Sequence, residues 1–247
     1  MSSPISLPAA TKSLVGKKAL VLGGSRGIGA AIVERLAAEG AATTFTYGGS
    51  KDAAESLAAR SGATAHQADS SDRAAVAALV AGEGAVDILV VNAGVAVGGD
   101  PLEIDPAEVD RLIDINVRSP YHAAVEAARR MPDGGRIIII GSVNGDRMPF
   151  PGFTAYALSK SAIQGLVRGL ARDLGPRGIT VNNVQPGPVD TDMNPADGPM
   201  KDMMHSVLAI KRHGRPGEIA ALVAFLAGPE AGYITGAQHT IDGGFGA

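Results

Sequence analysis

Tyr156 and Lys160 lie four residues apart in the stretch YALSK (156–160). On a helix, residues at this spacing share one face and are close enough to interact. A free tyrosine has a pKa of about 10, and a neighbouring cation lowers it by favouring the phenolate. The pair could therefore be an acid–base centre, or it could be one of many tyrosine–lysine pairs that surface helices carry by chance.

The composition limits the class of protein. The chain has 247 residues, of which 45% are hydrophobic and 19% charged, which suits one α/β domain with a sizeable core. A net charge of −3 gives no reason to expect a nucleic-acid polymer or an anionic membrane as partner. The absence of cysteine excludes disulfides and thiolate chemistry and fits a cytoplasmic protein. We find no signal peptide and no apolar stretch of the roughly 18 residues that a membrane helix needs.

Short apolar runs alternate with longer stretches of helical periodicity along the chain. The expected strands are 17–24, 41–49, 63–69, 86–94, 135–142, 178–187 and 237–242. The expected helices are 30–40, 51–62, 72–84, 106–131 with a possible bend near Pro120, 156–175 and 216–228. Strands that are apolar on both faces and joined by helices predict a three-layer, doubly wound parallel sheet of the Rossmann type. We expect a flexible tail over residues 1–14 and a single domain over 15–247.

The glycine-rich stretch GGSRGIG (23–29) follows the first expected strand and opens the first helix. Its glycines, Gly23, Gly27 and Gly29, permit a close approach of phosphate to the backbone at a helix N-terminus. The turn also contains Ser25, Arg26 and Ile28. It predicts a dinucleotide site and is not a P-loop, which requires GxxxxGK[ST]. The alternative is a glycine turn of purely structural use.

The end of the second strand bears on the choice of cofactor. Sites for NAD often have an acid there, but this chain has Tyr47 and no carboxylate before Asp52. Arg26, Ser50 and Lys51 are instead suited to a 2′-phosphate. We therefore expect NADPH/NADP+ and regard NADH as the less favoured cofactor, although Arg26 and Lys51 could equally be solvated surface charges.

Several motifs occur together in one order, and this order resembles the compact, single-domain branch of the short-chain dehydrogenase/reductase family over about residues 15–247. The motifs are GGSRGIG, VNAG (91–94), Asn116 in DINV, Ser142 in GSVNG, YALSK and PGPVDT (186–191). The chain departs from the family pattern at Leu22 and Val91, and Ser142 and Tyr156 are 14 positions apart where 13 is commoner. We expect these departures to affect local strand stability and a loop rather than catalysis.

The resemblance implies a catalytic role at four positions. Tyr156 would be the general acid that protonates the developing alkoxide, and Ser142 would hydrogen-bond the carbonyl oxygen. Lys160 would lower the pKa of Tyr156 and bind the nicotinamide ribose. Asn116 would hold a water that links Lys160 to solvent. Two positioned donors are what negative charge developing on a carbonyl oxygen requires.

The resemblance also implies cofactor contacts in the loops that follow three later strands. Asp69 would meet the adenine edge, and Asn92, Ala93 and Gly94 would line the adenine ribose. Thr191 would bind the nicotinamide carboxamide beside the backbone of Val189, and Pro186 and Gly187 belong to the same motif. Tyr156 and Lys160 would contact the cofactor as well.

A closer resemblance is to a bacterial subgroup described as cyclic-di-GMP-binding biofilm dispersal mediators. The stretches GSVNGDRMP, QPGPVDTDMNPADGPM and IKRHGRP carry it. Five residues could bind phosphates or could form a solvated rim around the site: Arg147, Lys211, Arg212, His213 and Arg215. We favour the rim.

Residues 188–213 follow the sixth strand and are expected to form a lid over the substrate. Its methionines, Met193, Met200, Met203 and Met204, are adaptable apolar contacts or, equally, core or interface residues. The histidines and carboxylates show no metal-ligand spacing, so we expect no metal site. The stretch around Ser142 lacks the GxSxG elbow of a hydrolase. The C-terminal tail resembles the segment that packs between subunits of homotetramers in this family.

These observations predict an NADPH-dependent reductase that interconverts a small ketone or aldehyde and its alcohol. The alternative of another class is a regulatory protein that binds cyclic-di-GMP, or only NADPH, on a reductase scaffold. The intact set Asn116, Ser142, Tyr156 and Lys160 favours turnover, because a binding protein needs none of them. An NAD-linked alcohol dehydrogenase is disfavoured by the absence of an acid at position 47.

Overall fold

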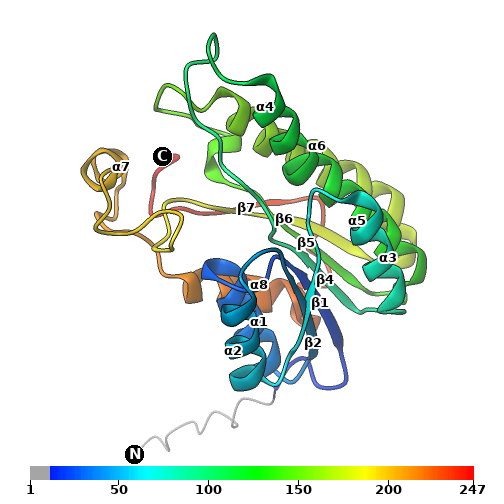
Figure 1. The fold of residues 1–247 in the computed structure, drawn as a ribbon. Helices are drawn as coiled ribbons and strands as arrows, with labels where there is room; N and C mark the ends of the chain where they lie inside the picture. Colours follow the sequence, from blue (N-terminus) through cyan, green and yellow to red (C-terminus); the bar gives the residue numbers. More distant parts are fainter. Residues whose placement is uncertain (1–11) are drawn as a thin grey trace, which may run out of the picture.

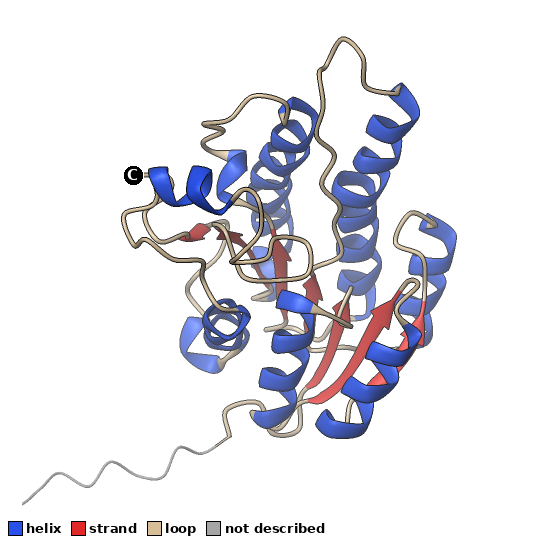
Figure 2. Cartoon of the chain, turned by 60° about the vertical axis from the view of Figure 1, so that its left-hand side comes forward, coloured by secondary structure: helices blue, strands red, loops and turns tan. Residues whose placement is uncertain are grey.

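The computed structural model describes residues 12–247, which form a seven-stranded sheet between two layers of helices (Figures 1 and 2). All neighbouring strands pair in parallel, in the order β3-β2-β1-β4-β5-β6-β7. The strands are β1 (Lys18–Leu22), β2 (Ala42–Tyr47), β3 (Thr64–Gln67), β4 (Ile88–Val91), β5 (Arg136–Ile140), β6 (Thr180–Pro186) and β7 (Gln238–Ile241). The predicted doubly wound fold is confirmed, and the order reverses between β1 and β4, where such sheets bind ligands.

The helices cover the sheet on both faces (Figure 1). One layer contains α1 (Gly27–Ala38), α2 (Lys51–Ser61) and α8 (Pro216–Ala227); the other contains α3 (Arg73–Gly82), α4 (Pro106–Ile113), α5 (Ser119–Arg130) and α6 (Thr154–Leu174). Short 3-10 turns span Val143–Gly145, Gly175–Arg177 and Pro229–Ala231. The strands must be apolar on both faces because each face packs against a different layer of helices. In β5, Ile138 packs into the core beneath α1 and α8, and the adjacent Ile139 packs into the core beneath α3, α5 and α6.

The segment expected as one helix over 106–131 is interrupted earlier than Pro120. Between α4 and α5 lies one π-helical turn, Asp114–Arg118, in which the backbone N–H of Ser119 donates to the carbonyl of Asp114. Proline at the second position of α5 is tolerated because its missing N–H falls in the first turn. Such π turns occur often at functional sites, and this one contains the buried side chain of Asn116.

The region expected as a lid contains a helix that the sequence did not reveal, α7 (Lys201–Val207). Figure 1 shows α7 away from the sheet and close to the C-terminus. Leu208 at its end joins Val143 and Phe245 in a small separate apolar cluster. This cluster connects the region after β6 with the C-terminal tail and with the residue that follows Ser142.

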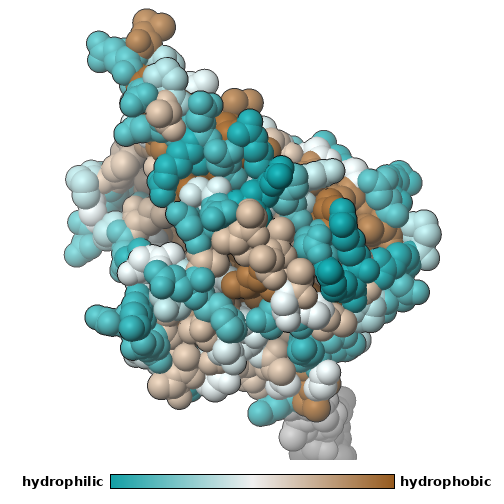
Figure 3. Space-filling model, turned by 45° about the vertical axis from the view of Figure 1, so that its right-hand side comes forward, coloured by the Kyte–Doolittle hydropathy of each residue, from teal (hydrophilic) through white to brown (hydrophobic). Residues whose placement is uncertain are grey.

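The expected tail, residues 1–14, lies mostly outside the described residues, which begin at 12. Leu14 is 1% exposed, and its backbone N–H donates to the carbonyl of Glu39. The packed domain therefore begins before residue 15. None of the helices formed by residues 12–247 has the length and apolar character that crossing a membrane requires. On the face seen in Figure 3, apolar side chains lie in small patches among polar ones.

Candidate active site

Ser142 and Tyr156 meet beyond the carboxyl end of β5. Ser142 is 8% exposed, and its hydroxyl accepts a hydrogen bond of 3.1 Å from the backbone N–H of Asn144, which fixes the start of the following turn. Tyr156 lies in the first turn of α6, with its phenol close enough to the Ser142 hydroxyl for that hydroxyl to affect its pKa. The intervening loop thus absorbs the 14-residue spacing without separating the two hydroxyls.

Lys160 lies one helical turn after Tyr156, as the spacing predicted. Its side chain is buried, its Nζ lies 5.7 Å from the centroid of the Tyr156 ring, and it donates to the carbonyl of Ile140 at 3.2 Å. Burial lowers the pKa of Lys160 to about 8 because the ammonium loses its hydration. The lysine therefore stands beside the tyrosine in a place where its charge is weakly solvated.

The pKa of Tyr156 moves in the direction opposite to the expectation. The side chain is partly accessible, yet burial raises the pKa of its phenol, and the neighbouring Ser142 hydroxyl opposes this rise without cancelling it. The expected lowering of this pKa by Lys160 does not appear: desolvation is the dominant influence, and only the Ser142 hydroxyl opposes it. Tyr156 is consequently a neutral phenol at neutral pH, which is the form that can donate a proton.

Asn116 fixes the loop that follows β4. Its amide accepts from the backbone N–H of Val95 at 2.9 Å and donates to the carbonyl of Val95 at 2.8 Å. It also donates at 3.1 Å to the hydroxyl of Ser159, which in turn donates to the carbonyl of Tyr156 at 2.8 Å. The sequence analysis did not identify Ser159 as a site residue. Its position three residues after Tyr156, on nearly the same face of the helix, was the signal that could have indicated it.

Gly94 closes the space between these residues. A Cβ added there would lie 3.4 Å from both the Oδ1 of Asn116 and the Nζ of Lys160. Asn116, Lys160 and the loop after β4 therefore form one compact group, in agreement with the predicted set. The water that Asn116 is expected to hold stays a prediction.

The buried lysine should make stability depend on pH. Its folded-state pKa of about 8 lies below the ordinary 10.5, so between these values the unfolded chain binds a proton that the folded chain releases. The free energy of unfolding should therefore rise with pH in this window. Relative to Lys160→Met, we expect native stability to increase by roughly 2 to 3 kcal/mol from pH 7 to pH 10.

Urea unfolding of both proteins at one protein concentration would measure this difference. Subtracting the variant removes the titration of the other lysines and tyrosines. A difference that stays constant across the window would show that Lys160 is solvated in the folded protein.

The glycine turn is held from two neighbouring strands. The backbone N–H groups of Gly23 and Gly24 donate to the side chain and carbonyl of Thr46 at 2.9 and 2.8 Å. Asn92 donates from its side chain to the carbonyl of Gly23 at 2.7 Å. The departures from the family pattern, Leu22 and Val91, are each 2% exposed and simply add to the core. Thr46, which the sequence did not single out, and Asn92 thus secure the turn.

The start of α1 fits a pyrophosphate. Arg26 is its N-cap, makes no side-chain cap, and no acidic residue lies in the first turn. Within residues 12–247 the backbone N–H groups of Gly27, Ile28 and Gly29 have no hydrogen-bond partner. Unpaired donors at a positive helix end bind phosphate groups readily. Arg26 is exposed and pairs with Asp192 at 3.5 Å, a contact between solvated charges that contributes little and leaves the guanidinium free to turn.

Most other predicted cofactor residues lie along the same edge of the sheet. Tyr47 ends β2, Ser50 is the N-cap of α2, and Lys51 begins that helix with a 3.7 Å ion pair to Glu55. Asp69 follows β3, and hydrogen bonds from the backbone and hydroxyl of Ser71 lower the pKa of its carboxyl.

The segment after β6 reaches back to the glycine turn. Pro186 ends β6, and the N–H of Gly187 donates to the carbonyl of Ile241 at 3.1 Å. Val189 forms a parallel bridge with Gly214. A Cβ on Gly27 would lie 3.0 Å from the side chain of Thr191. The structure therefore brings Thr191 and the phosphate turn together, although 164 positions separate Gly27 from it.

The cations considered as phosphate ligands are engaged within the chain. Arg147 donates to the carbonyls of Phe245 and Ala247. Lys211 donates to two carbonyls at the end of α7, at 2.9 and 3.2 Å. Both side chains therefore support local structure.

The remaining members of this group behave alike. Arg212 makes two hydrogen bonds to Glu218, at 2.9 and 2.7 Å, and Arg215 lies 3.7 Å from the same carboxylate. Glu218 consequently has its pKa lowered to about 2. His213 is 5% exposed, lies 3.0 Å from a ring nitrogen of His205, and has its pKa lowered by burial. Nor do the described residues bring together three His, Cys, Asp or Glu side chains that could hold a metal ion.

Comparison with known proteins agrees with this geometry. Residues 23–246 match the family described as enoyl-(acyl carrier protein) reductase. The chain is 66% identical over 235 residues to the cyclic-di-GMP-binding biofilm dispersal mediator protein of Escherichia coli K12, covering 95% of this chain and 99% of that protein.

Two solved structures of the same family are also similar to this chain. BdcA in complex with NADPH has a TM-score of 0.94 and 66% identity, with 95% and 96% of the two chains covered. A short-chain dehydrogenase from Burkholderia cenocepacia J2315 in complex with NADP has a TM-score of 0.93 and 48% identity, with 95% and 100% covered. The resemblance to the biofilm dispersal subgroup is confirmed, and the chain belongs to the short-chain dehydrogenase/reductase family of oxidoreductases.

Proposed function

We propose that this protein is an NADPH-dependent carbonyl reductase that converts a small ketone or aldehyde to its alcohol. One observation carries the proposal: the side chains of Ser142 and Tyr156 lie next to each other, beside the buried Lys160. This group lies at the same edge of the sheet as the uncapped start of α1. A protein that only binds a nucleotide has no use for such an arrangement.

The side chains have separable tasks in this reaction. Bound NADPH supplies a hydride to the carbonyl carbon, and negative charge then develops on the carbonyl oxygen. Ser142 hydrogen-bonds that oxygen and orients it, and Tyr156, held neutral by its raised pKa, donates the proton. Lys160 supplies positive charge beside the tyrosine, and Asn116 holds the loop and the helix in register.

The choice of NADPH rests on the residues after β2. No carboxylate lies at the end of that strand to repel a 2′-phosphate, and Arg26, Ser50 and Lys51 are available to bind it. The exposed ion pairs of Arg26 and Lys51 are weak enough to exchange for a phosphate. The NADPH and NADP complexes of two relatives support the same assignment.

Cyclic-di-GMP binding is the second candidate function, and the name of the Escherichia coli relative favours it. The cations first considered for its phosphates are already paired within the chain. Any such binding would therefore use other residues, and it would not explain the Ser142–Tyr156–Lys160 group. We rank it below reduction.

A second copy of the same chain is the protein partner that the surface favours. A groove of about 460 Å³ runs between α5 and α6, and its lining includes Tyr121, Gly165, Leu166 and Gly169. Small residues allow close helix approach, and Tyr121 is 48% exposed. We propose that a second copy packs here in a homotetramer, with the protein in the cytoplasm.

The test is a turnover assay. We expect the protein to oxidise NADPH with at least one member of a panel of ketones and aldehydes, and to use NADH far less well. Cyclic-di-GMP binding would be measured in parallel by calorimetry. Saturable NADPH binding without turnover on any carbonyl, together with tight cyclic-di-GMP binding, would replace the reductase by the regulatory protein.

A further inference from the structure

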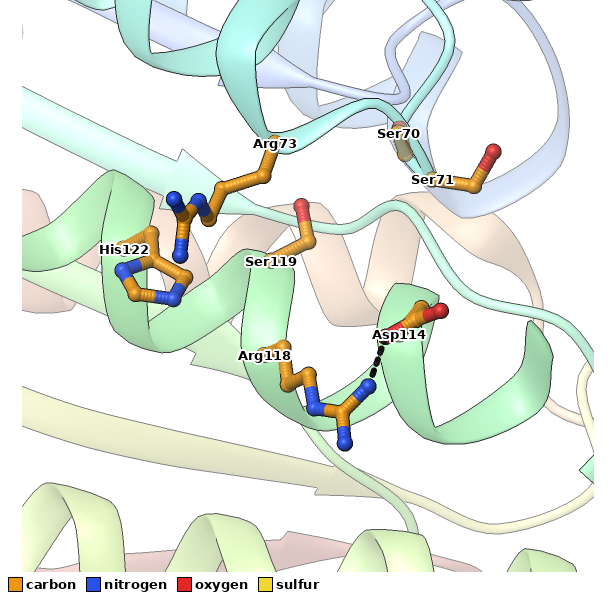
Figure 4. A pocket seen from close by; sticks show the side chains of 7 residues that line it. All are labelled: Ser70, Ser71, Arg73, Asp114, Arg118, Ser119 and His122. Atoms are coloured by element: carbon orange, nitrogen blue, oxygen red, sulfur yellow. Dashed lines mark hydrogen bonds and ion pairs between the residues drawn. The ribbon is translucent and has the colours of Figure 1, made fainter. Parts of the chain in front are cut away.

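The surface hollow drawn in Figure 4 lies between the loop after β3 and the helices α4 and α5, away from the candidate catalytic group. Within it Arg118 pairs with Asp114. None of its lining residues belongs to the turn that follows Ser142 or to the expected lid, residues 188–213. The surroundings of the catalytic group are shaped instead by packed side chains, and the C-terminal tail supplies one of them.

The tail after β7 is an ordered strap, residues 242–247, which Figure 1 shows next to α7. Gly243 and Gly244 have positive φ angles of 64° and 80°, which allow the chain to change direction there. The carboxylate of Asp242 accepts from the backbone N–H groups of Gly244 and Gly246, at 2.9 and 2.7 Å. These bonds fix the course of the strap up to its last residue but one.

One aromatic ring of the strap is buried between two segments of the site. Phe245 is 3% exposed and shares an apolar cluster with Val143, which directly follows Ser142. The same cluster contains Leu208, which directly follows α7, and Phe150 meets the Phe245 ring edge to face with centroids 6.0 Å apart. The cluster is separate from the two large cores on the faces of the sheet. Loss of the ring should therefore leave those cores closed.

Hydrogen bonds tie the strap to the same two segments. On the lid side, the backbone N–H of Ile210 donates to the carbonyl of Gly243 at 2.8 Å. On the other side, Arg147 lies in the loop that follows the candidate catalytic serine. Its guanidinium donates to the carbonyl of Phe245 at 2.9 Å and to that of Ala247. The strap is thus bonded both to the end of the lid and to the serine loop.

The serine loop matters for the reaction because it holds the reacting hydroxyl. The backbone N–H of Asn144 donates to the hydroxyl of Ser142 at 3.1 Å. A shift of this turn therefore moves the hydroxyl that the proposed mechanism places on the carbonyl oxygen. A displacement of about 1 Å in an orienting group can lower a rate by about a hundredfold.

We infer that Phe245 is a positioning residue that couples the expected lid to the turn carrying Ser142. The inference rests on the proposed reductase function. Docking of the lid end against the Phe245 ring and orientation of the Ser142 hydroxyl are one event, so that loosening the strap on either side loosens both. Enclosure of the substrate and readiness of the serine are thereby linked.

Hydrogen exchange followed by mass spectrometry tests the coupling without any turnover. Coupling through packed contacts corresponds to about a twofold to thirtyfold change in a local opening equilibrium. Arg147→Gln changes an exposed side chain on the serine side. With NADPH in excess, it should speed exchange within this range in peptides covering 201–211 and leave β5 unchanged. Val207→Ala, which trims the cluster from the lid side, should likewise speed exchange in 142–147.

Kinetics of Phe245→Ala test the consequence for the reaction. We expect kcat to fall by about tenfold to a hundredfold and the KM for the carbonyl to rise, while the NADPH dissociation constant stays within about twofold. Phe245→Leu refills most of the apolar space and should recover most of the loss. Tyr233→Ala, which removes a fully exposed aromatic ring, is the matched control and should behave as the native protein does.

Native kcat together with native exchange in Phe245→Ala would overturn the inference. Equally fast exchange in β5 would do so as well, because the ring would then support the whole fold. A change of oligomeric state, seen by light scattering, would assign the ring to a subunit interface instead. If the native protein reduces no carbonyl, the proposed function fails, whereas the exchange measurements still decide whether the strap couples the two segments.

Discussion

Replacing Tyr156 by phenylalanine is expected to lower the kcat of carbonyl reduction by about 10²- to 10⁴-fold, the usual contribution of a positioned general acid. The phenol is the neutral donor at neutral pH because burial raises its pKa. Phenylalanine keeps the ring and its contacts and removes only the proton donor. NADPH affinity should therefore change by no more than about twofold. Stopped-flow kinetics and a direct cofactor titration would separate the two quantities.

Tyr233→Phe is the matched control, because Tyr233 is fully exposed and loses the same atom. It should behave as the native protein in both measurements. If Tyr156→Phe retained half of the native kcat, the proton would have to come from another group and the proposed mechanism would be wrong. If it lost NADPH binding as well, Tyr156 would be chiefly a binding residue.

The sheet could be predicted from the sequence because each central strand is a short run of residues that is apolar on both faces. IIII in β5 and ILVV in β4 are apolar on both faces, and the structure buries each face in a different core. Glycines and prolines then marked the strand ends. Local pattern and global fold agree here, which is why the order of elements was also right.

The π turn at 114–118 could not be predicted, because no local residue requires it. Pro120 suggested a bend, but proline is tolerated in the first turn of α5 and the irregular turn comes before it. The turn allows Asn116 to bond to Val95 and Ser159, and both partners are distant in sequence. Tertiary contacts of this kind leave no periodic signal.

The proximity of the candidate catalytic residues was predictable from the sequence, but the pKa values of their side chains were not. The spacing of Tyr156 and Lys160 indicated proximity, and the structure shows it. The direction of the Tyr156 pKa depends on how much solvent the surrounding loops exclude, and these loops come from several parts of the chain. The helix α7 could not be predicted either, because its seven residues, KDMMHSV, have no clear apolar face.

The second large effect is expected from Gly29→Ala in the phosphate turn. A Cβ at this position would lie 2.1 Å from the carbonyl oxygen of Gly23 and 2.6 Å from the side-chain nitrogen of Asn92. Both are too close for any contact, and neither atom can yield easily because the two are hydrogen-bonded to each other at 2.7 Å. The turn must therefore open and α1 must move away from β4.

Such a displacement should act on binding and on stability together. Overpacking a tight site costs about 1 to 3 kcal/mol, and we expect a loss in the free energy of unfolding near the upper end of that range. NADPH affinity should fall by more than about a hundredfold, because binding relies on donors that the backbone holds in fixed positions. Urea unfolding and fluorescence titration with NADPH would measure the two effects.

Gly82→Ala separates this steric argument from the general effect of adding a methyl group. Gly82 ends α3, has no atom within 4 Å of its added Cβ, and does not have a positive φ. Alanine there should leave NADPH affinity unchanged and should alter stability by no more than about 1 kcal/mol, in the stabilising direction. Native-like NADPH binding by Gly29→Ala would mean that the turn is looser in solution than the packing around Gly23 and Asn92 implies, and the phosphate site would have to be sought elsewhere along the sheet edge.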